Sequence, residues 1–62
     1  MPNVSKMRAA RMKSLLKQNQ AAKIIGISKS YLCRLEQGDV MPTDDLLRKM
    51  SNLYRCHQSD LI

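Results

Sequence analysis

Residues Gln18–Gln37 read QNQAAKIIGISKSYLCRLEQ, and this stretch decides the predicted fold. Its first part carries apolar residues at helical spacing up to Gly26, a residue type that readily takes the left-handed conformation that ends a helix. Ser28 is a favourable N-cap for a second helix, which Gly38 would end. The stretch therefore predicts two short helices joined by a tight glycine turn.

The pattern of small and apolar side chains in this pair is typical of a helix-turn-helix, in which the second helix enters the major groove of DNA. Ala22 is small where the two helices would approach each other. The inward contacts are expected from Ala21, Ile25, Ile27, Leu32 and Leu35. An ordinary helical hairpin is the alternative interpretation of the same spacing.

Amphipathic segments on both sides of this pair complete an all-α fold of five short helices. The outer helices are expected from Asn3 or Val4 to Ser14, after Pro42 with Thr43 as N-cap, and from about Gln58 to Ile62. The sequence contains no linker and no repeat. Residues 1–62 are therefore expected to form a single domain with a small core of Leu, Ile, Ala and Met.

The net charge of +6 is unevenly distributed along the chain. Eight basic residues and no acid lie between Met1 and Arg34, whereas the remainder has three basic residues and five acids. A positive electrostatic field over half of a small domain favours a polyanionic partner, either nucleic acid or an anionic membrane. No apolar run approaches the roughly 18 residues that cross a bilayer, and the first helix lacks the apolar face of interfacial helices. Nucleic acid is therefore the expected partner, and a membrane is not.

Nothing in the sequence indicates an enzyme, a metal site or a cofactor. Paired carboxylates, a nucleophile with its base and a glycine-rich phosphate loop are all missing at usable spacing. His57 is the one histidine, and with Cys33 and Cys56 it gives no zinc-binding spacing. Both cysteines are expected to stay reduced, because a small disulfide-linked protein usually carries more of them.

Several blocks of the sequence match one family together: Arg11 ahead of Leu16, Gln18–Ala22–Gly26–Ile27–Ser28, the stretch from Ser30 to Gly38, Pro42–Thr43, and Asp60–Leu61–Ile62. On these residues the chain resembles the lambda-repressor-like, Cro-type (XRE) helix-turn-helix family over nearly its whole length. The resemblance implies that the third helix reads base edges and that the N-terminus of the second grips a phosphate. By position, Gln18 would hold the phosphate, and Lys29, Ser30 and Arg34 would face the bases.

Electrostatics favours the same surface. Lys17 precedes the second helix and Lys29 lies in the first turn of the third, where positive charge opposes the helix dipole by about 0.3–1 kcal/mol. A phosphate backbone across both N-termini would explain these two lysines, although exposed lysines that cost little are the alternative. Arg34 can donate to guanine O6 and N7, or else contact a phosphate or form a surface ion pair. The expected DNA-binding residues are Lys17, Gln18, Ser28, Lys29, Ser30, Tyr31, Cys33 and Arg34.

Two of these residues have competing roles. Tyr31 can stack against the sugar-phosphate wall or close the core. Cys33 stands where the family often has serine, so it is either a redox-sensitive thiol at the DNA surface or a simple replacement.

The resemblance also implies structural contacts and one departure from the family pattern. Arg11 and Glu36 would form a partly buried ion pair between the first and third helices. After Gly38 the family usually has a basic residue that contacts phosphate, whereas this chain has Asp39–Val40–Met41. In related repressors this loop lies near the dimer interface, so the candidate dimer contacts are Val40, Met41, Tyr54 and Arg55. A loop packed on its own core is the alternative.

These observations predict a sequence-specific transcriptional regulator that binds double-stranded DNA, with repression as the favoured role. A homodimer is expected at least on DNA, together with a regulatory protein partner. The expected location is the cytoplasm, for a bacterial or phage-encoded protein that is associated with the nucleoid when bound. The alternative is a protein-interaction module, such as an antitoxin or antirepressor, that uses the same fold.

Overall fold

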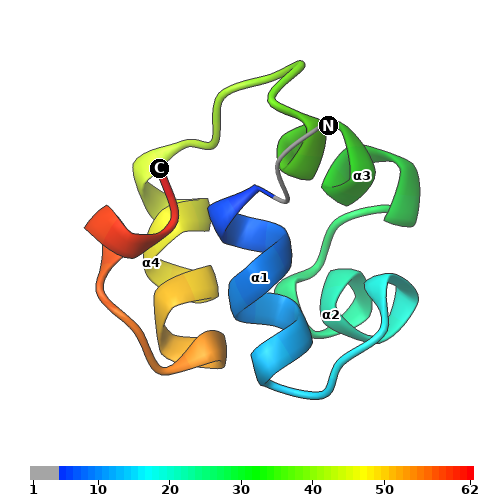
Figure 1. Ribbon diagram of the computed structural model, residues 1–62. Coiled ribbons are helices and arrows are strands. Elements are labelled where there is room, and N and C mark those ends of the chain that lie inside the picture. The colour runs from blue at the N-terminus through cyan, green and yellow to red at the C-terminus, as the bar shows by residue number, and fades with distance from the viewer. Residues whose placement is uncertain (1–4) are drawn as a thin grey trace.

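The computed structural model describes residues 5–62 and shows four α-helices followed by one 3-10 turn (Figure 1). The helices are α1 (Lys6–Lys13), α2 (Gln18–Ile25), α3 (Lys29–Gln37) and α4 (Asp44–Tyr54), and the 3-10 turn is η1 (Gln58–Asp60). No strand occurs within residues 5–62. The all-α prediction is confirmed, but the count of five helices is wrong, because the last segment makes only a single 3-10 turn. The expected start of the first helix at Asn3 or Val4 lies outside the described residues.

Three of the four helices begin at a hydroxyl N-cap. The side chains of Ser5, Ser28 and Thr43 accept hydrogen bonds from the backbone N–H three residues ahead, at 3.1–3.2 Å. The exception is α2, whose N-cap residue Lys17 makes no side-chain cap bond. Instead, Gln20 Oε1 accepts from the Lys17 N–H at 3.0 Å. The backbone N–H groups at the N-terminus of α2 thus have fewer hydrogen-bond acceptors within the chain than those of the other three helices.

A left-handed residue follows each of the four helices, directly after α2, α3 and α4 and one residue after the C-cap Ser14 of α1. Each turn is closed by a hydrogen bond that spans five residues. The left-handed residues are Leu15, Gly26, Gly38 and Arg55, with φ of 60°, 93°, 84° and 54°. The next N–H donates back to the last helical turn at 2.9–3.3 Å, as in the Schellman motif. Three of these next residues, Leu16, Ile27 and Cys56, pack against the core. This repeated turn ends each helix sharply and redirects the chain.

The core lies between the four helices, each of which contributes buried side chains. In Figure 1, α1 lies between α4 and the α2–α3 pair. Leu32 and Met50 are the largest fully buried side chains. The other buried apolar residues are Met7, Ala21, Ala22, Ile25, Leu35, Leu47, Tyr54 and Leu61. Small alanines on α2 allow it to approach α3 closely, which fixes the geometry of the helix-turn-helix.

One core side chain carries an unpartnered polar group. Tyr54 is 6% exposed, and within the described residues its hydroxyl has no hydrogen-bond partner. Burial raises the pKa of this phenol from 10.0 to about 12, and the nearby Glu36 carboxylate adds to the rise. The phenol therefore stays neutral at physiological pH and contributes to the core as an apolar ring.

Replacing Tyr54 by phenylalanine should stabilise the protein. Removing an unpartnered buried hydroxyl is expected to raise the free energy of unfolding by about 1 kcal/mol. As the pH rises, the unfolded chain loses the phenolic proton first, so the parent's stability holds below pH 10 and falls from there toward pH 12. In denaturant titrations at pH 7, 10 and 11.5, the free energy of unfolding should fall less at alkaline pH for Tyr54→Phe than for the parent. An equal loss in both proteins would contradict this assignment.

Candidate nucleic-acid interface

A buried ion pair joins α1 to α3. Arg11 Nε lies 2.7 Å from Glu36 Oε2, and Arg11 Nη2 lies 3.4 Å from Glu36 Oε1. The two side chains are only 10% and 3% exposed. Arg11 Nη1 also donates to the backbone oxygen of Leu16 at 2.8 Å. One guanidinium therefore fixes α1, α3 and the turn that leads into α2.

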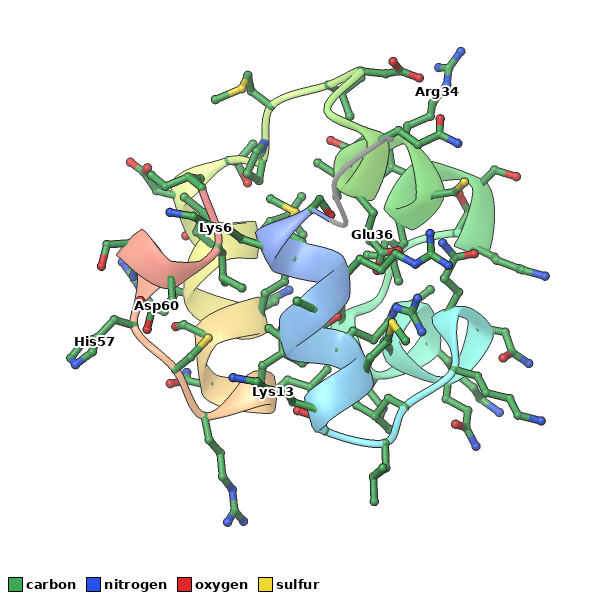
Figure 2. All side chains as sticks on the ribbon, viewed as in Figure 1. Lys6, Lys13, Arg34, Glu36, His57 and Asp60 are labelled. Carbon is green, nitrogen blue, oxygen red and sulfur yellow. The ribbon has the colours of Figure 1, made fainter. Side chains whose placement is uncertain are left out.

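Gln18 extends this network to the start of α2. Its Nε2 donates to Glu36 Oε1 at 2.9 Å, so both oxygens of the Glu36 carboxylate are occupied by donors. Figure 2 shows Glu36 in the interior between α1 and α3. Gln18 was expected from the family resemblance to hold a phosphate, and the contact with Glu36 is a second role that the sequence did not indicate. It places the α2 N-terminus in a fixed position relative to α3.

A basic hollow lies over this network. It has a volume of about 410 Å³ and is lined by Arg8, Arg11, Lys17, Gln18, Asn19 and Lys29. These residues come from α1 and from the N-terminal ends of α2 and α3. The lining contains four cationic side chains and no acid. Because the N-termini of both helices also carry partial positive charge, the hollow is suited to an anion.

The hollow includes two residues that sequence reasoning missed. Arg8 is exposed and lies one turn before Arg11 on α1, and Asn19 is the second residue of α2. The i, i+3 spacing of Arg8 and Arg11 could have indicated a shared face of the helix. Asn19 gave no such signal, because its place in the hollow depends on how α2 packs against α1 and α3.

The other predicted contacts lie along α3. Ser28, Lys29, Ser30 and Arg34 are exposed, whereas Tyr31 and Cys33 are half-buried. Figure 2 shows Arg34 extending away from the body of the protein. Tyr31 packs against the core, so its ring has a structural contact whatever else it touches. The exposed side of α3 thus presents two cations, Lys29 and Arg34, and the hydroxyl of Ser30, with Lys29 also lining the basic hollow.

The four candidate dimer contacts are separated by the fold. Met41 is 77% exposed, and Val40 is half-buried against the core. Arg55 is exposed, but Tyr54 is buried in the core of its own chain and has little surface to offer a partner. A surface for self-association would therefore centre on Met41.

The described residues hold few features for other chemistry. Cys33 and Cys56 are free thiols. Within residues 5–62, no group of three or more His, Cys, Asp or Glu side chains is arranged to hold a metal ion. The longest helix, α4, has 11 residues, and none in the described part of the chain has the length and apolar character to span a bilayer.

Two short helices joined at Gly26, with an exposed basic α3 and a basic hollow at the helix N-termini, define a helix-turn-helix protein. The helix-turn-helix family model matches residues 7–60, and the chain belongs to this lambda-repressor-like, Cro-type (XRE) family. Its fold is similar to the solution structure of the DNA-binding domain of the P22 C2 repressor, with a TM-score of 0.82 and 25% sequence identity. The match covers 90% of this chain and 74% of that one. No curated protein matches the sequence.

Neutralising Glu36 should destabilise the whole interface. Glu36→Gln leaves the buried Arg11 guanidinium without a counter-charge, and we expect a loss of about 3 kcal/mol in the free energy of unfolding. Asp39→Asn, which neutralises an exposed acid close to α3, should change stability by less than about 0.5 kcal/mol. Thermal melts followed by circular dichroism provide the comparison. Melting of Glu36→Gln within about 2 °C of the parent would contradict a structural role for the pair.

Proposed function

We propose that this protein is a sequence-specific regulator of transcription that binds double-stranded DNA through α3 in the major groove. The observation that carries the proposal is the basic hollow, in which three exposed cations, Arg8, Lys17 and Lys29, lie with two helix N-termini beside the exposed side of α3. The similarity to the DNA-binding domain of the P22 C2 repressor supports the same partner.

The two parts of the surface have different tasks in this proposal. Lys17, Lys29 and the second N–H of the Gln18 amide bind the phosphate backbone and set the position of α3. Arg8 and Asn19 join them because they line the same hollow. Arg34 donates to guanine O6 and N7, and Ser30 contacts a neighbouring base edge. Phosphate contacts thus supply affinity, whereas α3 supplies discrimination.

Repression is the regulatory role that we propose. The bound protein would act by occupying its operator in the cytoplasm of a bacterium, encoded either by the bacterium or by a phage. Two copies would bind half-sites whose centres lie about 34–36 Å apart, one turn of the double helix. Control would come from the concentration of the protein or from a regulatory protein partner.

A protein-interaction module with the same fold is the second candidate function, favoured by the exposed Met41. The dependence of binding on salt separates the two candidates. Contacts to several phosphates release counterions, so DNA binding should weaken steeply as salt increases. An apolar protein interface should respond only weakly.

Lys29→Gln should weaken binding to all duplexes by a similar factor. It removes one phosphate contact, so the slope of log K against log salt should become shallower by about one. Lys49→Gln removes an exposed lysine from α4, away from the hollow, and should leave the slope unchanged. Fluorescence anisotropy with labelled duplexes between 50 and 300 mM salt measures both. Equal slopes for the two variants would refute the phosphate role of Lys29.

Met41→Asp should weaken self-association on DNA. The substitution places a charge on the exposed apolar side chain of the 39–42 loop, where we propose that two copies meet. Ile24→Asp is the matched control, because Ile24 is an exposed apolar residue on α2. Sedimentation of the protein with a duplex of two half-sites should give a two-copy complex for the parent and Ile24→Asp, and a one-copy complex for Met41→Asp. A two-copy complex with Met41→Asp would exclude this surface.

A further inference from the structure

A second cationic surface lies between α1 and the C-terminal part of the chain. It is a cleft of about 480 Å³, within the size range of ligand sites. The cleft is lined by Lys6, Ala9, Ala10, Lys13, Tyr54, Arg55, Cys56 and Asp60. Figure 2 shows Lys6 and Lys13 reaching toward the side on which α4 and η1 lie, with Asp60 across from them. The one ion pair found within residues 5–62 is Arg11–Glu36, so these lysines have no acidic partner among the described residues.

The cleft lies on the opposite side of α1 from the basic hollow. Lys6 and Lys13 are seven residues apart and so share one side of the helix. Arg8, which lines the hollow, follows Lys6 by two residues and is rotated from it by about 200° at 3.6 residues per turn. Phosphates bound in the hollow would therefore leave the two lysines of the cleft unneutralised.

The rest of the lining distinguishes the cleft from a nucleic-acid surface. Ala9, Ala10 and Cys56 are half-buried and form an apolar floor. Burial raises the pKa of the Cys56 thiol, and Asp60 raises it further, so the thiol stays neutral. Asp60 is an exposed carboxylate whose Oδ2 accepts a hydrogen bond from the His57 N–H at 3.3 Å. Its other oxygen can accept from the N–H groups of a peptide, which a phosphate backbone does not have. A partner with carboxylates, N–H donors and apolar atoms suits this lining better than DNA does.

We infer that the cleft binds an acidic peptide segment of a partner protein. The separation of the two lysines sets the spacing of its carboxylates. Seven residues of α-helix rise about 10.5 Å. An extended polyproline-type segment has three residues per turn at 3.1 Å each, so acidic side chains three residues apart lie on one side at about 9 Å. Such a segment would place one carboxylate near Lys6 and one near Lys13, across the alanine floor. DNA and the peptide could then be bound at the same time.

The test is an NMR titration of the isotope-labelled chain with the blocked peptide Glu-Pro-Pro-Glu. Its matched control is Gln-Pro-Pro-Gln, which has the same backbone preference and no charge. The acidic peptide should give saturable amide shifts centred on Lys6, Ala9, Ala10, Lys13 and Cys56, and the neutral peptide should give none. Shifts centred on the N-termini of α2 and α3, or no saturable shift, would overturn the inference.

Paired variants separate the cleft from general attraction of positive charge. Lys6→Gln with Lys13→Gln should weaken peptide binding by about fivefold, as expected for the loss of two exposed ion pairs. Lys23→Gln with Lys49→Gln removes the same charge from exposed positions on α2 and α4 outside the cleft and should weaken binding by less than about twofold. Equal effects of the two pairs would overturn the inference. If a variant pair fails to fold, the map of amide shifts on the parent protein is the test of the inference.

A separate titration with duplex DNA keeps this inference distinct from the proposed function. Peptide shifts in the cleft should persist when the chain is saturated with DNA, and the peptide should leave DNA affinity unchanged within about twofold. Displacement of the peptide by DNA would show that the two share one surface and would overturn the separate site. Loss of DNA binding with peptide binding intact would refute the proposed function and leave the inference standing.

Discussion

The ion pair between Arg11 and Glu36 is the interaction on which the arrangement of the helices depends. It is buried, so two charges have left water, and this cost is offset only if the geometry is good and the remaining polar atoms find partners. Both conditions are met, because Arg11 also donates to the Leu16 oxygen and Glu36 also accepts from Gln18. The network joins α1, α2 and α3 through one side chain from each helix. It thereby fixes the orientation of α3 relative to the other two helices.

The positions of the exposed charges show a conflict between stability and binding. Asp44 and Asp45 lie in the first turn of α4, where negative charge complements the helix dipole. At the corresponding ends of α2 and α3 the chain has Lys17 and Lys29, and α2 lacks a side-chain cap bond. The two lysines and the missing cap bond are each unfavourable for the stability of the isolated protein. A bound phosphate would make them favourable, because it supplies both the counter-charge for the lysines and the hydrogen-bond acceptor that α2 lacks.

The sequence predicted the parts of the fold that depend on local chemistry. Gly26, Ser28 and Gly38 marked the helix ends correctly, since each residue type is suited to its local conformation. The left-handed residues Leu15 and Arg55 could not be recognised, because neither type favours positive φ. Leu15 is also 90% exposed, and nothing in the structure explains an apolar residue there. Only part of the lining of the hollow could be predicted from the sequence. Arg8 and Asn19 were missed, because their place in the hollow arises from packing between helices.

Selection of binding sites from random duplex DNA, with the parent and Arg34→Ala in parallel, tests DNA reading most directly. The parent should enrich a motif of two symmetric half-sites about one helical turn apart. Arg34→Ala should bind with similar salt dependence but lose the preference at one guanine of each half-site. Failure of the folded parent to enrich any motif would contradict the claim that this helix-turn-helix reads DNA sequence.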